Sequence, residues 1–124
     1  MTADITELDK LNLAFAERFN AQDLDGLHDL FEADAIFVPA PGTPVPAEGV
    51  RGALEQFLGL NLPITMSVRN AFANGDLGLV VADWTIEGTG PDGSQVSLAG
   101  STADLARRGE QGWKYVIDNP FGTA

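Results

Sequence analysis

Asp104 is the residue whose placement most clearly suggests chemistry. It lies in the run 95–107, where the residue types alternate as they do in a half-buried β-strand, and it falls on the apolar face of that run. A carboxyl group on an apolar face loses water, which raises its pKa and suits it to general acid or base catalysis. The alternative is structural: the strand end turns Asp104 toward solvent, or Asp104 pairs with Arg107 or Arg108.

Five other side chains on the same face could orient the oxygen of a ligand or line its pocket. Thr102 and Asn119 fall opposite each other, so they either present a hydroxyl and an amide to a ligand or satisfy one another. Trp84 and Tyr115 carry a polar group on a large apolar ring, and they either pack in the core or line a cavity. Asn70 is a similar polar candidate near the end of a hairpin.

His28, the only histidine, could shuttle protons near neutral pH, and it is the second catalytic candidate. Asp25, Asp29 and Glu32 are close enough in the sequence to orient its ring. The alternative is an exposed histidine on a helix surface among acids. A lone histidine in a chain without cysteine argues against a multi-histidine or cysteine metal site, so we predict no metal.

Asp83 and Asp118 are predicted to lie close together on the opposite, more polar face of the strands. Two neighbouring carboxyl groups can mark a site. The structural alternative is that they pair with Arg69 or Lys114. Their role stays open at this point.

Helices in the first part of the chain must support these strands. Apolar residues at three- and four-residue steps predict a helix over 5–19, a short one over 24–31 behind an Asp23 cap, and a third over 51–60. A short strand over 35–38 ends at Pro39. The proline-rich stretch 39–46 then forms a rigid loop, either a lid over a site or a plain connection.

Four strand-like runs fill the second part of the chain, at 64–72, 76–88, 95–107 and 113–120. Loops of three residues at 73–75 and 91–93, and of two residues at 110–111, set an antiparallel register. This register produces an apolar, aromatic face and a smaller face rich in Ala, Ser, Thr and Val. We therefore expect one α+β domain over 1–124, with three helices packed on the apolar face of a curved antiparallel sheet.

Composition excludes several classes of function. Lys and Arg number 7 against 18 Asp and Glu, and the net charge of −11 repels nucleic acid and anionic membrane surfaces. The hydrophobic content of 44% is too high for a disordered chain. With no apolar run of spanning length and no basic leader, we expect a soluble, cytoplasmic protein.

Several segments resemble a known superfamily. Residues 20–31, 33–35 and 49–52 resemble SnoaL-like and ketosteroid-isomerase-like proteins, whose cystatin-like cone is also the nuclear transport factor 2-like fold. Residues 82–85, 91–93 and 113–120 are similar to the SgcJ/EcaC-type subgroup. This superfamily includes isomerases, cyclases, dehydratases, epoxide hydrolases and non-enzymatic binding domains. The resemblance therefore implies the fold more narrowly than the activity.

The chain departs from the pattern of ketosteroid isomerases at two of their three key positions. That family uses a tyrosine of the first helix, an aspartate base after the first strand and a protonated aspartate on a later strand. Here Phe15 and Pro39 stand at the first two positions, and Asp104 lies two residues from the third, near Thr102. We therefore expect that the protein is not a ketosteroid isomerase.

Two functions fit these observations. The first is a cone domain that binds a small hydrophobic, oxygenated molecule and, as an enzyme of the isomerase, cyclase or hydrolase type, transfers protons without a cofactor through Asp104. The second is a non-catalytic binding or assembly module. Under either hypothesis we expect a homodimer that packs through the outer, more polar face of the sheet.

Overall fold

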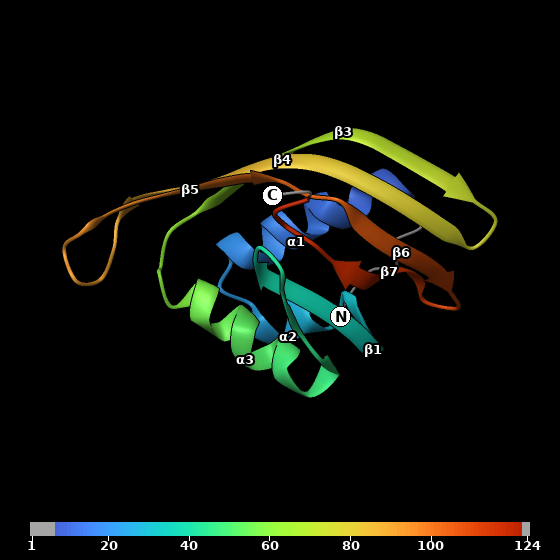
Figure 1. Ribbon diagram of the computed structural model, residues 1–124, viewed down its shortest axis with the longest axis horizontal. Helices are drawn as coiled ribbons and strands as arrows, with labels where there is room; N and C mark the ends of the chain where they lie inside the picture. Colours follow the sequence, from blue (N-terminus) through green and yellow to red (C-terminus); the bar gives the residue numbers. More distant parts are fainter. Residues whose placement is uncertain (1–6, 123–124) are drawn as a thin grey trace.

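Helices cover one side of the molecule and a curved sheet forms the other (Figure 1). The computed structural model describes residues 7–122. Its helices are the 3-10 turn η1 (Leu8–Lys10), α1 (Leu11–Asn20), α2 (Leu24–His28) and α3 (Ala47–Leu58). The part of the first predicted helix before Glu7 lies outside the described residues. Among residues 7–122, no helix has both the length and the apolar composition needed to cross a membrane.

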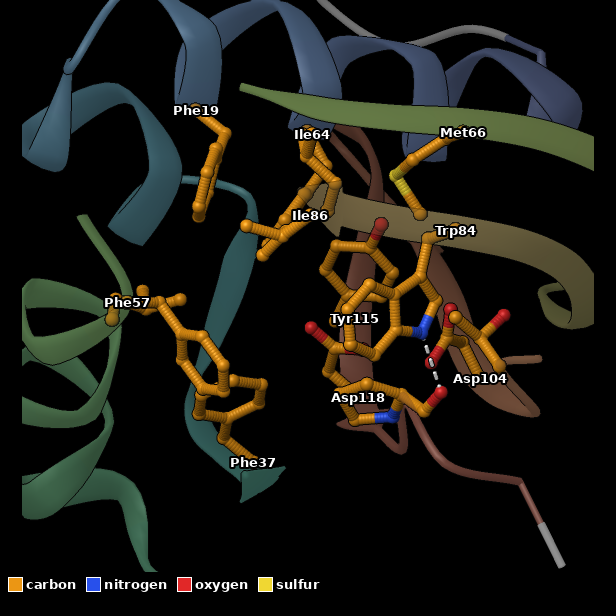
Figure 2. A pocket seen from close by; sticks show the side chains of 14 residues that line it. Phe19, Phe37, Phe57, Ile64, Met66, Trp84, Ile86, Asp104, Tyr115 and Asp118 are labelled. Atoms are coloured by element: carbon orange, nitrogen blue, oxygen red, sulfur yellow. Dashed lines mark hydrogen bonds between the residues drawn. The ribbon is translucent and has the colours of Figure 1, made fainter. Parts of the chain in front are cut away.

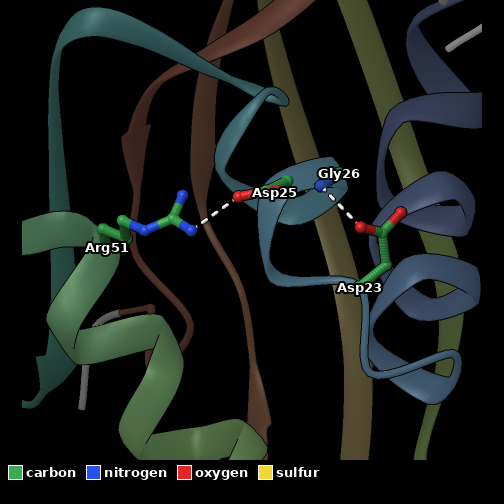
Figure 3. A network of polar contacts seen from close by, with 4 residues as sticks. All are labelled: Asp23, Asp25, Gly26 and Arg51. Atoms are coloured by element: carbon green, nitrogen blue, oxygen red, sulfur yellow. Dashed lines mark hydrogen bonds and ion pairs between the residues drawn. The ribbon is translucent and has the colours of Figure 1, made fainter. Parts of the chain in front are cut away.

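Helix α2 is short, and polar contacts hold it at both sides (Figure 3). The Asp23 carboxylate accepts a hydrogen bond of 2.9 Å from the Gly26 N–H, as predicted for the cap of this helix. The next acid, Asp25, pairs with Arg51 of α3 at 2.5 Å. The helix ends at His28 and not at residue 31, because the chain turns there and Phe31 already opens the first strand.

Within the described residues, seven strands form one sheet. In sequence order they are β1 (Phe31–Ala40), β2 (Thr43–Val45), β3 (Ile64–Asn74), β4 (Leu77–Thr89), β5 (Gln95–Ser101), β6 (Asp104–Gly109) and β7 (Gly112–Asp118). Their spatial order is β2-β1-β7-β6-β4-β3, and β5 pairs with the far half of β4. All strand pairs are antiparallel except β1 with β7, which is parallel. The sheet is therefore mixed, whereas a wholly antiparallel sheet was predicted. The α+β cone itself is confirmed.

Two segments differ from the prediction. The strand predicted over 35–38 runs through Pro39, because the pairing of β1 with β2 is irregular between Phe37 and Ala40 and the missing N–H costs no ladder bond there. The proline-rich loop is therefore a β-hairpin at the edge of the sheet. The run 95–107 divides into β5 and β6 at Thr102, because β4 is long enough to pair with both.

The predicted register holds for β4 with β5 and β6, where Trp84 faces Gly100 and Val80 faces Asp104. Between β3 and β4 the predicted register is wrong throughout, because the turn consists of residues 75–76 and not 73–75, so that Phe72 faces Leu79 and not Asp76. Two β-bulges that the sequence analysis did not foresee also change which face some side chains lie on. The first lies between Val68 and Asn70 in β3. The second lies in β7, where Ala106 faces Tyr115 but the next residue, Leu105, faces Ile117. Each bulge adds one residue to a strand, so the side chains beyond it point to the opposite face from the one predicted.

The apolar core lies between the helices and the inner face of the sheet. Aromatic rings from α1, β1 and β7 pack there, with Phe15 edge-on to Tyr115 and Phe31 tilted against it. Leu54 of α3 and Leu11 of α1 are fully buried in this layer. The helices thus close the open side of the curved sheet.

Candidate functional site

A small cavity remains between the inner face of the sheet and helices α1 and α3 (Figure 2). Its free volume is about 30 Å³, which is room for two or three water molecules at roughly 10–15 Å³ each. The side chains of the protein itself therefore fill most of the cone. The lining is aromatic and aliphatic apart from three polar groups: Thr102, Asp104 and Asp118. Figure 2 shows both carboxyl groups beside Trp84, at the opposite end from Phe37 and Phe57.

Asp104 starts β6 on the inner face, where it was predicted, and it is 1% exposed. Its carboxylate accepts 2.8 Å from the Asn119 N–H and 3.2 Å from the Asn12 amide, and Thr102 and Asp118 line the same cavity. Burial raises the pKa of Asp104, and these donors oppose that rise. Asp104 is therefore neither turned to solvent nor paired with an arginine.

Asp118 reaches the same cavity because of the bulge in β7. It was predicted on the outer face beside Asp83, but it is buried and lines the cavity with Asp104. Burial comes first among the causes that raise its pKa well above the ordinary value, and the charge of Asp104 raises it further. Because burial and the charge of Asp104 both raise the pKa of Asp118, we infer that the pair retains one proton.

Tyr115 and Asn12 extend this pair into a chain of hydrogen bonds. The Tyr115 hydroxyl donates to the Asn12 carbonyl oxygen, and the Asn12 amide donates to Asp104. Burial, with the charges of Asp118 and Asp104, raises the pKa of Tyr115 well above its ordinary value, so its hydroxyl stays protonated. Asn12 comes from α1 and is fully buried. No feature of its sequence neighbourhood had singled it out.

Trp84 closes the cavity together with the end of the chain. Its indole N–H donates 2.7 Å to the Pro120 carbonyl, and Phe121 packs edge-on against its ring at 5.5 Å between centroids. Gly100 beside it leaves room for the indole only: a Cβ there would lie 2.9 Å from the Trp84 nitrogen. The space predicted opposite Gly100 for a ring or a ligand is therefore taken by the ring.

Three predicted site residues lie away from the cavity. Asn70 is exposed on the outer face, because the bulge in β3 reverses its direction, so its predicted face was wrong. The Asn119 side chain donates to the Gly122 carbonyl, and only its backbone N–H serves Asp104. His28 is half-buried at the end of α2 and is not among the residues that line the cavity.

One alternative was that the Thr102 and Asn119 side chains form a hydrogen bond with each other across the strands. The structure has other partners for both. The Thr102 hydroxyl accepts 3.1 Å from the Ala82 N–H, and the Asn119 carbonyl accepts from the Ala103 N–H. The bulge in β7 removes the expected pairing. Thr102 itself is buried and lines the cavity as predicted.

Asp83 has a separate, structural position on the outer face. It pairs with Arg69 at 2.8 Å and accepts 2.6 Å from the Ser101 hydroxyl, which lowers its pKa. Asp83 and Asp118 were predicted side by side, and the sheet now lies between them. Within residues 7–122, no group of three or more metal-ligating side chains is gathered around one point.

Cone and cavity together define a class of protein: an α+β domain whose helices close a curved sheet over an apolar interior with buried acids. A family model described as the SnoaL-like domain matches residues 13–113. The chain therefore belongs to the SnoaL-like family. A search of curated proteins finds no match.

Solved structures agree with this assignment at the level of the fold. An NTF2-like protein of unknown function from Shewanella oneidensis is 13% identical, with a TM-score of 0.71 over 88% of this chain and 91% of the other. A ketosteroid isomerase-like protein from Erwinia carotovora is 16% identical, with a TM-score of 0.72 over 90% and 89%. A proposed aromatic ring hydroxylase from Novosphingobium aromaticivorans is 28% identical, with a TM-score of 0.68 over 88% and 81%.

Proposed function

We propose that this protein binds a small hydrophobic molecule bearing an oxygen atom, and that Asp118 and Asp104 hold that oxygen. The observation that carries this proposal is a pair of buried carboxyl groups, whose pKa values burial raises, at one end of an otherwise apolar cavity. Buried ionisable groups cost free energy of folding, and they cluster at functional sites. An aromatic lining favours a ring system as the apolar part of the ligand.

The chemistry that suits this pair is proton transfer without a cofactor. A carbonyl oxygen of the bound ligand replaces Asp104 as the acceptor of the hydrogen bond that Asp118 donates. The Asp104 carboxylate, which burial makes more basic than a surface aspartate, removes a proton from the carbon beside that carbonyl. The intermediate is an enolate whose oxygen accepts the hydrogen bond from Asp118, and return of the proton from Asp104 to carbon regenerates a ketone.

A ligand with a ring needs more than about 30 Å³, so binding must displace side chains. Three half-buried lining residues are the candidates for this movement: Phe57, Met66 and Pro120. Methionine adapts readily, because its side chain has three rotatable bonds. We expect Met66→Ala to enlarge the cavity and to accelerate binding.

The test is a titration with 1-tetralone, an aromatic ketone, followed by Trp84 fluorescence in a Trp113→Phe background. The similarity to a proposed aromatic ring hydroxylase from Novosphingobium also favours an aromatic probe. We expect saturable binding that Asp118→Leu weakens about tenfold, the value of one lost hydrogen bond. Asp83→Asn, on the outer face, is the control variant and should leave the affinity unchanged. The control ligand 1-naphthoate should bind more weakly, because its negative charge is repelled by that of Asp104.

Equal affinities in the native protein and in Asp118→Leu would contradict the proposed role of Asp118. If 1-tetralone and a set of related phenols and quinones all fail to perturb Trp84, the proposed cavity is not a binding site. The predicted cytoplasmic location is independent of this test and stays a prediction.

A second function, assembly with another copy of the chain, is favoured by one observation on the outer face. An apolar row crosses five strands in register there: Phe72, Leu79, Leu105, Ile117 and Ile36. Phe72 is 61% exposed and Leu79 43%. Nearby basic residues are each paired with an acid, among them Arg107 with Glu32 at 3.1 Å. We propose that a second copy covers this row, because local neutrality lets it approach despite the net charge of −11.

A further inference from the structure

We propose that Asn12 is a positioning residue that decides which carboxyl group of the pair carries the proton, placing the charge on Asp104 and the proton on Asp118. This inference rests on the proposed function in one respect: it assigns the acid and the base of that site. The proton's location can nevertheless be measured without any ligand. A failure to bind a ligand would therefore not overturn this inference, and a failure of this inference would not exclude binding.

The argument starts from the two different ends of an amide. An asparagine side chain accepts through its carbonyl oxygen and donates through its NH₂ group. In α1, Asn12 lies where one end meets Tyr115 and the other meets Asp104. It is fully buried, so water cannot replace either partner. Its orientation is therefore tied to the protons of its two neighbours.

Tyr115 fixes that orientation. A phenol hydroxyl has one proton to donate, and burial and the nearby carboxyl charge keep that proton on the oxygen. It is given to the Asn12 carbonyl, so the Asn12 NH₂ group faces the Asp104 Oδ2 atom at 3.2 Å. The reversed amide would turn a carbonyl oxygen toward Asp104, and that contact requires a proton on Asp104.

The remaining donors are unevenly divided between the two acids. Asp104 also accepts the Asn119 N–H at 2.8 Å, on the oxygen that Asn12 does not serve, and the nearby Thr102 hydroxyl lowers its pKa further. Within residues 7–122 no N–H group is hydrogen-bonded to the Asp118 side chain, and its polar partner is Asp104. Several hydrogen-bond donors therefore stabilise a negative charge on Asp104. Among the described residues, the Asp118 side chain accepts from no N–H group, so it carries the proton and donates it in a hydrogen bond.

No basic side chain among the lining residues offsets this uneven distribution of hydrogen-bond donors between Asp104 and Asp118. The titratable groups that line the cavity are Asp104, Asp118 and Tyr115, and no lysine, arginine or histidine is among the lining residues. Arg107 and Arg108, the nearest basic residues in the sequence, face Glu32 and Asp76. The polar contacts of Asn12, Asn119 and Thr102 therefore set the proton's location.

The experiment is ¹³C NMR of the native protein with labelled aspartate carboxyl groups, recorded from pH 4 to 9 without ligand. Asp104→Asn and Asp118→Asn assign the two resonances. We expect a carboxylic acid at Asp118 and a carboxylate at Asp104 at neutral pH. In Asn12→Leu the Asp104 midpoint should rise by about one pH unit, the effect of losing one charge-assisted hydrogen bond, while the Asp118 midpoint falls.

Two further variants keep the test decisive. Leu13→Ala, the next residue of α1, is an exposed control and should leave both midpoints unchanged. Tyr115→Phe removes the group that orients the amide, so it should shift the midpoints in the same direction as Asn12→Leu, and it serves if Asn12→Leu does not fold. A protonated Asp104 in the native protein, or unchanged midpoints in the folded Asn12 or Tyr115 variant, would overturn the inference.

Discussion

At the scale of single residues, the central feature is a carboxyl pair that no basic side chain neutralises. Asp104 could be predicted to lie inward because its strand alternates regularly with its partner β4. Asp118 could not, because its direction depends on a bulge two residues earlier. Asn12 could not either, since a polar residue on a helix is ordinarily exposed and only the tertiary contacts with Asp104 and Tyr115 explain its burial.

The shared proton predicts how stability depends on pH. The folded pair retains a proton that the unfolded aspartates release near their ordinary pKa of 3.8, because burial raises both folded pKa values and the charge of Asp104 raises that of Asp118 further. This contribution is therefore complete below about pH 4 and is lost as the pH rises toward the folded pKa. In that window the free energy of unfolding should fall by up to about 1.4 kcal/mol per pH unit for the one proton.

Asp118→Asn supplies the comparison, since its amide can donate to Asp104 as the acid does but cannot ionise. Urea unfolding of the native protein and the variant between pH 4 and 8 measures the difference in slope. Exposed aspartates with lowered pKa values, such as Asp83 and Asp92, act in the opposite direction and cancel in this comparison. Parallel curves for the two proteins would show that Asp118 ionises normally.

At the scale of elements, the two β-bulges account for the side chains that lie on the opposite face of the sheet from the one predicted. Together they turn Phe72 and Ile117 outward and bring Asp118 inward. Bulges of this kind need no glycine, and the residues at both sites, Arg69 and Val116, are ordinary strand formers. Alternation therefore predicts the faces correctly up to each bulge, and it reverses them beyond it.

The turn over residues 119–122 is the element that links the chain end to the cavity. It provides the Pro120 carbonyl for Trp84 and the Asn119 N–H for Asp104. Gly122 lies at φ +58°, and a Cβ there would approach the Ser101 carbonyl oxygen to 2.6 Å. The turn therefore requires glycine at this position.

Gly122→Ala should displace this turn and cost about 1–2 kcal/mol from the left-handed backbone alone. In a Trp113→Phe background, Trp84 fluorescence should shift to the red, and acrylamide should quench it more strongly. Gly109→Ala is the matched control, because a Cβ at Gly109 meets open space. Unchanged Trp84 emission in the Gly122 variant would mean that the turn does not cover the cavity.

At the scale of the whole molecule, the fold could be predicted because helix periodicity, glycine-containing turns and the family resemblance all indicate one α+β cone. The parallel pairing of β1 with β7 was missed because the two strands are far apart in the sequence and no local turn signals their contact. The outer face was expected to be small and polar. The bulges instead place large apolar side chains across it.

Assembly through that row has a direct test in sedimentation equilibrium. We expect the native protein to be a dimer and Leu79→Lys to be a monomer with an unchanged circular dichroism spectrum, because a buried lysine would meet its symmetry mate's apolar row. Leu13→Lys on α1 is the control, since its 42% exposure matches the 43% of Leu79. A native protein that remains monomeric at all concentrations would exclude this interface.

Hydrogen–deuterium exchange at the carbon beside the carbonyl of 1-tetralone, followed by ¹H NMR in D₂O, tests the central claim that the buried pair performs acid and base chemistry. We predict exchange above the buffer rate in the native protein and in Asp83→Asn, and exchange at the buffer rate in Asp104→Asn and Asp118→Asn. If the ketone saturates the native protein and still exchanges at the buffer rate, the claim is contradicted. The cone would then be a binding module without catalysis.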